Sequence, residues 1–242
     1  MISSNYEIAG KVVCINSLYS FVHEYCRDYL TEKEADYSVT TSPADIENEK
    51  ARSAAEDALR GRQPREYPEP YLESLAVYRK ITDEMAGYDT ILFHGSAVAL
   101  DGEAYLFTAA SGTGKSTHAL LWKELFGDRL TIVNDDKPLI KVGEKPVVYG
   151  TPYRGKHGRG ENTSVPLKAI CIVTRASENS IRPVTPKEVY ASLISRVYRP
   201  ADAVKTAAVL KLADRLFDSV GLYVLGCNMD ISAAKTAYEG MK

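Results

Sequence analysis

Short apolar runs alternate with longer amphipathic segments along this chain. A spacing of three or four residues between apolar positions predicts a helix, and a brief continuous apolar run predicts a buried strand. The strands predicted in this way cover residues 7–15, 130–133, 138–142, 168–173 and 221–227. The predicted helices cover residues 18–30, 71–86, 115–126, 186–197, 201–218 and 230–240, and the composition of 44–60 also favours a helix.

The segment "TILFHGSAVALDGEAYLFTAA" (residues 90–110) contains two apolar runs joined by Asp101-Gly102. An Asp-Gly pair in this position is a strong signal for a β-hairpin. An antiparallel hairpin among alternating strands and helices predicts an α/β fold with a mixed β-sheet and flanking helices. We expect residues 1–90 to form an N-terminal α/β portion, packed on a core of residues 91–242 as one continuous domain.

Composition narrows the classes of partner. The chain is 45% hydrophobic and 26% charged with a formal net charge of −2, which gives no electrostatic reason to expect nucleic acid or an anionic membrane as partner. The longest apolar runs are too short to span a bilayer, and the N-terminus lacks the pattern of a secretion signal. The four cysteines lie far apart without a C-x-x-C pair, so we expect reduced thiols and a cytoplasmic location.

The stretch "AASGTGKS" (109–116) matches the phosphate-binding pattern G-x-x-x-x-G-K-[ST], with Ala109 at the first position. It joins a predicted strand to a predicted helix, so its backbone N–H groups and the helix N-terminus can converge on phosphate oxygens. We expect Lys115 to reach the β- and γ-phosphates of a nucleotide and Ser116 to ligate Mg²⁺. The expected nucleotide-binding residues are Ser111, Gly112, Thr113, Gly114, Lys115, Ser116 and Thr117.

A pair of acidic residues follows in "TIVNDDKPLI", with Asp135 placed 20 residues beyond Lys115. Ligands of α/β folds bind at the carboxyl ends of the strands, and this pair directly follows a predicted strand. One carboxylate suits the Mg²⁺ shell, and the second could take a proton from an attacking hydroxyl. The alternative is an Asn-Asp-Asp turn that only separates two strands.

Together these residues resemble the catalytic domain of the HPr kinase/phosphorylase family, whose wider relatives include the ATP-dependent phosphoenolpyruvate carboxykinases. The resemblance rests on "FHGSAVALDGEAYLFTAASGTGKSTHALL" followed by "IVNDDKPLI", within residues 91–175. A hairpin that feeds a P-loop, followed by paired aspartates, is the order found in that family. The rest of the chain looks like a bacterial HPr kinase-like branch of unsettled role. The resemblance implies a P-loop kinase core with the HPr kinase/phosphoenolpyruvate carboxykinase fold.

The resemblance also implies roles for individual residues. Asp135 would be the general base, and Asp136 would support the metal or the acceptor, alongside Ser116. Lys115 would bind phosphate, and His94 would lie near the transferred phosphate. On the sequence alone, His94 could equally be a core histidine, because it ends an apolar run.

A basic, glycine-rich segment, "GTPYRGKHGRGENTSVP" (150–166), stands where the family has an E-x-x-G-x-G segment. Such a loop can close over an anionic substrate and neutralise charge during phosphoryl transfer. Arg154, Lys156 and Arg159 are therefore candidate substrate-binding residues. The alternative is a solvated loop whose charges serve solubility.

The leading hypothesis is a Mg-ATP-dependent kinase that transfers the γ-phosphate to a hydroxyl of a small molecule, with ATP and Mg²⁺ as cofactors. A small acceptor is favoured because a compact basic loop occupies the region after the aspartates. Three alternatives stay open: a protein serine kinase/phosphorylase like HPr kinase, a carboxykinase-type lyase, and a nucleotide-binding regulatory switch without acceptor chemistry. The resemblance also leaves a homo-oligomer open.

Overall fold

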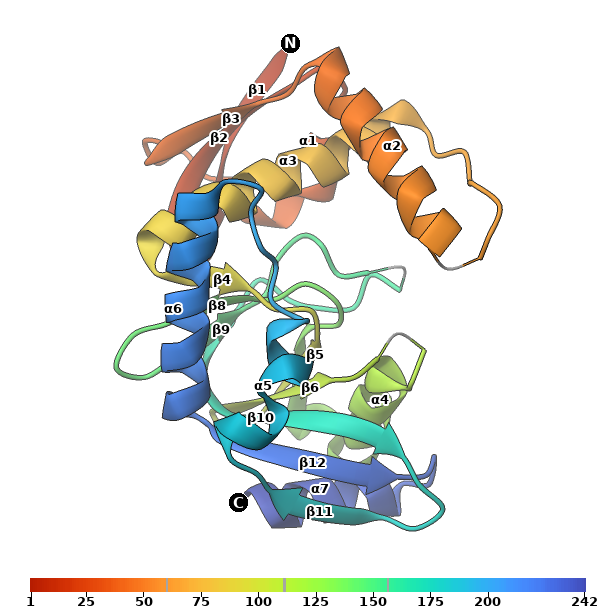
Figure 1. The fold of residues 1–242 in the computed structure, drawn as a ribbon. Coiled ribbons are helices and arrows are strands. Elements are labelled where there is room, and N and C mark those ends of the chain that lie inside the picture. Colours follow the sequence, from red (N-terminus) through yellow and green to blue (C-terminus); the bar gives the residue numbers. More distant parts are fainter. Residues whose placement is uncertain (60, 111, 156) are drawn as a thin grey trace. The chain divides into compact units, whose positions relative to one another are not determined.

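The computed structural model describes residues 1–59, 61–110, 112–155 and 157–242. The chain forms two compact units, Met1–Glu84 and Met85–Lys242, each with its own sheet (Figure 1). The second unit therefore begins at Met85, ahead of the position 91 expected from the sequence pattern. Every described candidate site residue belongs to this second unit.

The first unit combines a three-stranded sheet with helices. β1 (Ile2–Ile8) and β2 (Lys11–Ser17) form an antiparallel hairpin, and β3 (Tyr37–Thr40) lies parallel to β2. The helices are α1 (Phe21–Tyr25), the 3-10 helix η1 (Arg27–Tyr29), α2 (Pro43–Leu59) and α3 (Glu69–Met85).

Two predictions for this unit are wrong. The strand predicted over 7–15 is interrupted at Ala9 and Gly10, which take left-handed φ values of 51° and 73° and make the hairpin turn. Alanine rarely adopts that conformation, so Ala9 carries no turn signal, and a single glycine does not specify a hairpin. The helix predicted over 18–30 ends at Tyr25, because the chain turns to pair with β1 through an isolated bridge between Leu30 and Tyr6.

The described part of the second unit contains a nine-stranded mixed sheet. Its strand order is β4-β8-β9-β10-β6-β5-β7. β12 also pairs with β10, on the side opposite β6, and β11 pairs with β12. The strands are β4 (Thr90–Leu92), β5 (Ser96–Leu100), β6 (Glu103–Thr108), β7 (Leu130–Asn134), β8 (Leu139–Lys141), β9 (Val147–Tyr149), β10 (Ser164–Arg175), β11 (Ser180–Pro183) and β12 (Gly221–Cys227).

The long strand β10 connects the two parts of this sheet. Its first residues pair antiparallel with β9, whereas its later residues pair parallel with β6 on one side and β12 on the other. Since β5 is antiparallel to both β6 and β7, strand β7 runs in the same direction as β6. The carboxyl ends of β6, β7, β10 and β12 therefore meet at one edge of the sheet, which is where ligands of α/β folds bind.

Helices cover both faces of this sheet (Figure 1). One hydrophobic cluster packs α5 (Pro186–Ile194) and α6 (Ala203–Ser219) onto the sheet through side chains such as Leu193, Leu212 and Phe217. The other packs α4 (Lys115–Phe126) and α7 (Ser232–Met241) onto the opposite face, around Trp122 and Phe107. The predicted mixed α/β sheet with flanking helices is confirmed.

The structure agrees with most of the predicted elements in this unit. The Asp101-Gly102 hairpin turn is confirmed, with φ values of 52° and 83° between β5 and β6. β9 and β11 were not predicted, and β11 carries a proline that suits an edge strand. The helix predicted over 186–197 ends at Ile194, where the chain turns so that Val197 pairs with Phe93.

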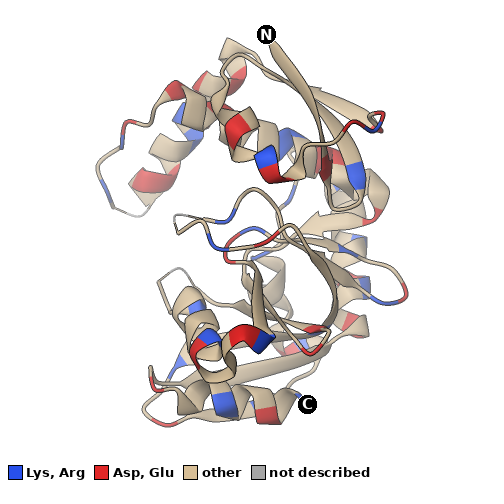
Figure 2. Ribbon diagram, turned by 180° about the vertical axis from the view of Figure 1, so that it is seen from behind, with Lys and Arg blue, Asp and Glu red and all other residues tan. Residues whose placement is uncertain are grey.

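Charges of both signs are interspersed along the helices in Figure 2. Within the described ranges, no helix is long and apolar enough to cross a membrane.

Candidate functional site

The loop between β6 and α4, which carries the P-loop pattern, contains two glycines with positive φ values. Gly112 and Gly114 take φ values of 78° and 125°, which non-glycine residues rarely adopt. A Cβ atom placed on Gly112 would meet no other atom within 4 Å, so glycine is needed here for its backbone conformation and not for space. The helix starts directly after the loop, where His118 N donates to Gly114 O at 2.8 Å. Ser111, an expected nucleotide-binding residue, lies outside the described residues.

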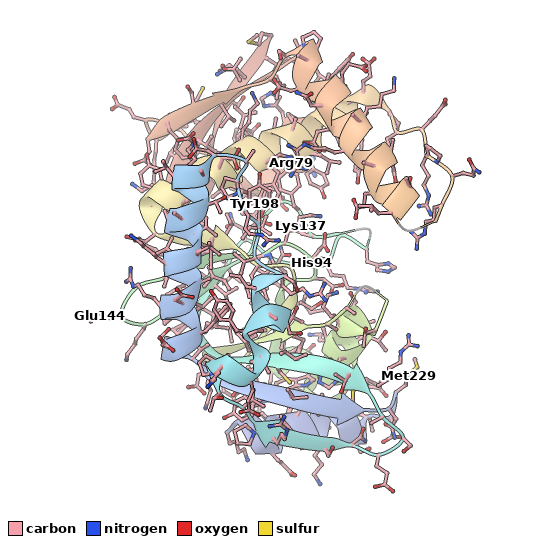
Figure 3. All side chains as sticks on the ribbon, in the orientation of Figure 1. Arg79, His94, Lys137, Glu144, Tyr198 and Met229 are labelled. Carbon is pink, nitrogen blue, oxygen red and sulfur yellow. The ribbon has the colours of Figure 1, made fainter. Side chains whose placement is uncertain are left out.

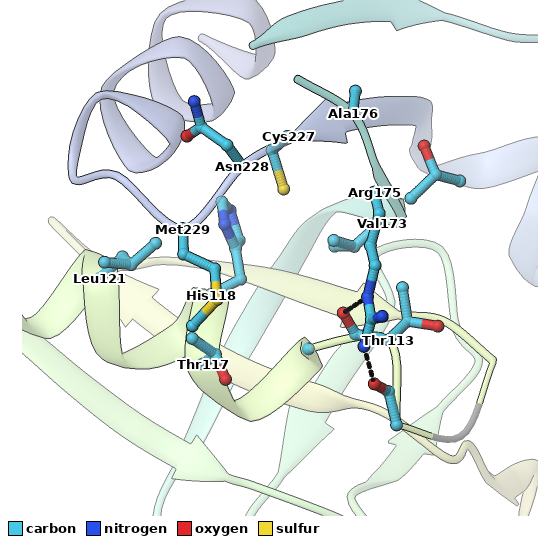
Figure 4. A pocket seen from close by; sticks show the side chains of 13 residues that line it. Thr113, Thr117, His118, Leu121, Val173, Arg175, Ala176, Cys227, Asn228 and Met229 are labelled. Atoms are coloured by element: carbon cyan, nitrogen blue, oxygen red, sulfur yellow. Dashed lines mark hydrogen bonds between the residues drawn. The ribbon is translucent and has the colours of Figure 1, made fainter. Parts of the chain in front are cut away.

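An arginine that the sequence interpretation missed holds this loop. Arg175, the last residue of β10, donates from Nη2 to Gly112 O at 2.7 Å and from Nε to Thr113 O at 3.4 Å (Figure 4). With these two carbonyls turned toward Arg175, the loop has a second support besides helix α4. The only sequence signal was its place at the end of a buried strand, which is too general to identify it.

A cavity of about 470 Å³, here called the acidic cavity, lies on one flank of the P-loop. It brings together most of the candidate residues from separate elements. Its walls are Gly112, Gly114, Lys115, Ser116, Thr117, His94, Asp135, Asp136, Arg154, Gly155 and His157. Among the other candidates, Thr113 lines a neighbouring cavity, Arg159 contacts Asp135, and Lys156 lies outside the described residues.

Lys115 faces the two aspartates. Burial lowers the pKa of Lys115, the carboxylates of Asp136 and Asp135 oppose that effect, and the nearby Arg196 reinforces it. Arg196 follows α5, and its backbone carbonyl accepts a hydrogen bond from His94 N at 2.8 Å. Lys115 and Arg196 are therefore two neighbouring cations at this end of the sheet.

Asp135 is nearly buried, with 3% of its side chain exposed. Ser96 Oγ donates to Oδ1 of Asp135 at 2.6 Å, and Arg159 Nη1 lies 3.6 Å from Oδ2. Both carboxylate oxygens therefore have fixed neighbours, which hold the group in one orientation at the cavity wall.

Asp136 lies among cations. His94 Nε2 is 3.3 Å from Asp136 Oδ1, and Lys137 Nζ contacts Oδ2; both residues are labelled in Figure 3. Burial alone would raise the pKa of Asp136, but the His94 hydrogen bond and the Lys137 ammonium outweigh it and hold that pKa well below its usual range. Asp136 is thus a stable carboxylate, suited to a cation and poorly suited to taking a proton.

His94 belongs to this site and is not a core histidine, because 43% of its side chain is exposed and it contacts Asp136. Its neighbour Gly95 explains the His-Gly pair in the sequence. A Cβ atom on Gly95 would come within 2.8 Å of Phe107 O, so only glycine fits beside β6.

Asn134, directly before the acidic pair, shapes the turn that carries both aspartates. Its Oδ1 accepts from Asp136 N at 2.9 Å and from Lys137 N at 2.7 Å. Its Nδ2 donates to Thr151 Oγ1 at 3.0 Å, which ties the turn to the start of the glycine-rich segment. The Asn-Asp-Asp sequence is therefore a turn that also directs two carboxylates into a cavity.

The basic glycine-rich segment packs against the acidic pair. Asp135 N donates to Arg159 O at 3.1 Å, and Glu161 N donates to Val133 O at 3.2 Å. Gly155 lies so close to Asp136 that a Cβ atom there would be 2.9 Å from Asp136 Cβ. These contacts argue against a loop that is solvated on all sides, and they place Arg154 in the wall of the acidic cavity.

The donor set of this cavity fits Mg²⁺ that arrives with a nucleotide. In the described ranges, no three His, Cys, Asp or Glu side chains gather into a metal site. Mg²⁺ in nucleotide enzymes needs only one or two carboxylates together with phosphate oxygens and water. Ser116, Asp135 and Asp136 supply a hydroxyl and two carboxylates around one cavity.

These features define a mixed α/β protein with a glycine-rich loop and an acidic pair at the carboxyl edge of its sheet. The family model described as "SynChlorMet cassette protein ScmC" matches residues 71–197, which is more than half of the chain. The chain belongs to this family. The match includes the P-loop, the acidic pair and the glycine-rich segment.

Other comparisons are more distant. No curated protein matches the chain. Among solved structures, the HPr(Ser) kinase/phosphatase from Coxiella burnetii is similar, with a TM-score of 0.34 and 8% sequence identity, over 61% of this chain and 94% of that one.

Proposed function

We propose that this protein is a Mg-ATP-dependent kinase that transfers the γ-phosphoryl group to a hydroxyl of a small molecule. The observation that carries the proposal is that Lys115 of the glycine-rich loop and both aspartates line the same cavity. A phosphate-binding loop alone would fit a nucleotide switch. A second carboxylate beside the loop supplies a group that can act on an acceptor.

The residues divide between binding and proton transfer. The backbone N–H groups of the P-loop and Lys115 would hold the β- and γ-phosphates, and Ser116 and Asp136 would hold Mg²⁺. When bound, Mg²⁺ neutralises charge on the phosphate oxygens. His94 orients Asp136, which it contacts at 3.3 Å.

Asp135 is the general base of this proposal. Its carboxylate accepts the proton of the acceptor hydroxyl as the hydroxyl oxygen bonds to the γ-phosphorus. The bond from the γ-phosphorus to the bridging oxygen breaks, and ADP leaves with that oxygen. The contacts from Ser96 and Arg159 keep the carboxylate oriented before the acceptor arrives.

The dimensions of the site support a small acceptor. The acidic cavity has a volume of about 470 Å³ and must also hold the terminal phosphates. The glycine-rich segment forms one wall, and Arg154 and Arg159 add positive charge near the aspartates. An anionic or zwitterionic molecule with a hydroxyl fits this combination of size and charge.

A label-transfer experiment tests the proposal and separates it from its alternatives. Incubation with γ-labelled ATP and a bacterial lysate should label a compound in the small-molecule filtrate. Arg154→Ala should raise KM for that compound, whereas Arg159→Ala should also lower kcat because Arg159 contacts Asp135. Arg129→Ala, at an arginine paired with Asp101 in the same unit, is the matched control. Label on a discrete protein band would favour the protein kinase, and hydrolysis without transfer would favour the switch.

A further inference from the structure

The P-loop lies between two cavities with different walls. The second cavity, here called the apolar cavity, also has a volume of about 470 Å³. Gly112, Gly114 and Thr117 line both cavities. A polyphosphate chain bound along the loop can therefore have one end in each.

The apolar cavity is suited to a neutral group with apolar faces. Its lining includes Leu121 of α4, Val173 of β10, Cys227 at the end of β12, and Met229 (Figure 4). The arginine in its wall, Arg175, already donates to two P-loop carbonyls. On a further flank of the loop, a third cavity is lined by both Arg175 and Arg196, which suits anions better than a neutral ring.

Met229 stands at this cavity with 78% of its surface exposed. The chain around it is nevertheless fixed. Asn228 N donates to Asn179 Oδ1 at 3.0 Å, and Asn228 Oδ1 accepts from Asp230 N at 3.0 Å. A large apolar side chain is thus held in solvent at a cavity mouth. A methionine sulfur makes favourable contacts with aromatic rings.

His118 supplies a second, independent observation. Trp122 Nε1 donates to His118 Nε2 at 3.1 Å, so Nε2 is an acceptor and the proton of the neutral ring is on Nδ1. His118 is 1% exposed, and burial lowers its pKa to about 4, which keeps the ring neutral. Its Nδ1 has no hydrogen-bond partner among the described residues, although His118 lines the apolar cavity. His118 therefore places a neutral ring, and not a charge, in the wall of the apolar cavity.

We propose that the apolar cavity holds the heterocyclic base of the nucleotide. The bound nucleotide then runs from a base beside Leu121, Val173 and Met229, across Gly112 and Gly114, to a γ-phosphate beside the acidic pair. This inference rests on the proposed function and deepens it, because it gives the nucleotide a direction. It also assigns base recognition to residues outside the P-loop pattern.

The experiment uses Trp122, the only tryptophan of the chain, as a reporter. Binding of MgATP and of magnesium tripolyphosphate, which lacks a base, is measured by calorimetry and by tryptophan fluorescence. Both ligands should bind, and only MgATP should change the emission of Trp122, through its hydrogen bond with His118. Met229→Ser should weaken MgATP binding roughly two- to tenfold, the range expected for a sulfur–aromatic contact, and leave tripolyphosphate binding unchanged. Val204→Ser is the matched control, at an α6 residue that is 79% exposed.

The outcomes separate this inference from the function on which it rests. The base does not occupy the apolar cavity if MgATP and tripolyphosphate bind equally well, if MgATP leaves Trp122 emission unchanged, and if Met229→Ser binds MgATP like the unmodified protein. That result would leave the proposed phosphate site intact. If neither ligand binds, the nucleotide function fails and the base site fails with it.

Discussion

Ser96 Oγ donates a hydrogen bond of 2.6 Å to Asp135 Oδ1, although the two residues are 39 positions apart. Ser96 begins β5 and Asp135 directly follows β7, and these strands are antiparallel neighbours. The register of the sheet therefore fixes the orientation of the carboxylate that we propose as the general base. Ser96 is fully buried, so water does not compete for this contact.

Ser96→Ala should lower turnover by about tenfold and leave nucleotide affinity unchanged, because it frees the carboxylate without removing it. It should also cost about 1–3 kcal/mol of stability, since Asp135 loses a buried hydrogen-bond donor. Steady-state kinetics and chemical denaturation measure the two effects. Ser195→Ala, at an exposed hydrogen-bonded serine, is the control. An unchanged kcat in Ser96→Ala would show that the contact serves stability alone.

The two aspartates should have separable roles. Asp135→Asn should keep MgATP binding and lose about 10²–10⁴ in turnover, the usual cost of removing a general base. Asp136→Asn should impair both, because we propose that Asp136 supports the metal, and it contacts His94 and Lys137. Calorimetry with MgATP and turnover measurements distinguish the variants. Asp128→Asn, at a fully exposed aspartate in the same unit, should behave like the unmodified protein. Normal turnover in both site variants would reduce the pair to a turn.

Arg175→Met should raise the Kd of MgATP by about tenfold, because two hydrogen bonds to the P-loop backbone are lost. The chemical step should change little, since Arg175 does not line the acidic cavity. The comparison is with Arg182→Met, which removes an exposed arginine paired with Glu188. An equal loss of affinity in both variants would show that Arg175 has no specific role in nucleotide binding.

His118 should make the second unit sensitive to acid. Burial lowers its pKa from the ordinary 6.5 to about 4, so the unfolded chain binds more protons between these values and stability falls as pH falls through that window. The full loss is on the order of 3 kcal/mol. Unfolding followed by Trp122 fluorescence at several pH values measures it. His118→Gln, which keeps a side-chain acceptor for Trp122, should lose this dependence. If the free energy of unfolding depends on pH in the same way for the unmodified protein and for His118→Gln, the prediction is contradicted.

The sequence was informative wherever a local pattern decides the structure. The Asp101-Gly102 turn and the strand before Asn134 have local signals, and the structure contains both. The fold of 7–15 was not predictable in this way, because the left-handed turn at Ala9 depends on the pairing of β1 with β2.

The residues of the candidate site also divide into those with a local sequence signal and those placed by strand pairing. The P-loop glycines and the aspartate pair follow a spacing that the sequence displays. Arg175 and Ser96 do not, because their contacts join residues more than 35 positions apart. Only the sheet register brings such residues together, and a single sequence does not reveal that register.

We propose that the cavity beside Lys115 transfers phosphate from ATP. The most direct measurement is transfer of label from γ-labelled ATP to the small-molecule filtrate by the unmodified protein, by Lys115→Ala and by Lys123→Ala. Lys123 lies on the same helix and donates to Leu130 O, away from the P-loop. We expect transfer by the unmodified protein and by Lys123→Ala, and almost none by Lys115→Ala with the fold intact. Equal transfer by Lys115→Ala, or no transfer by the unmodified protein with any hydroxyl compound present, would contradict it.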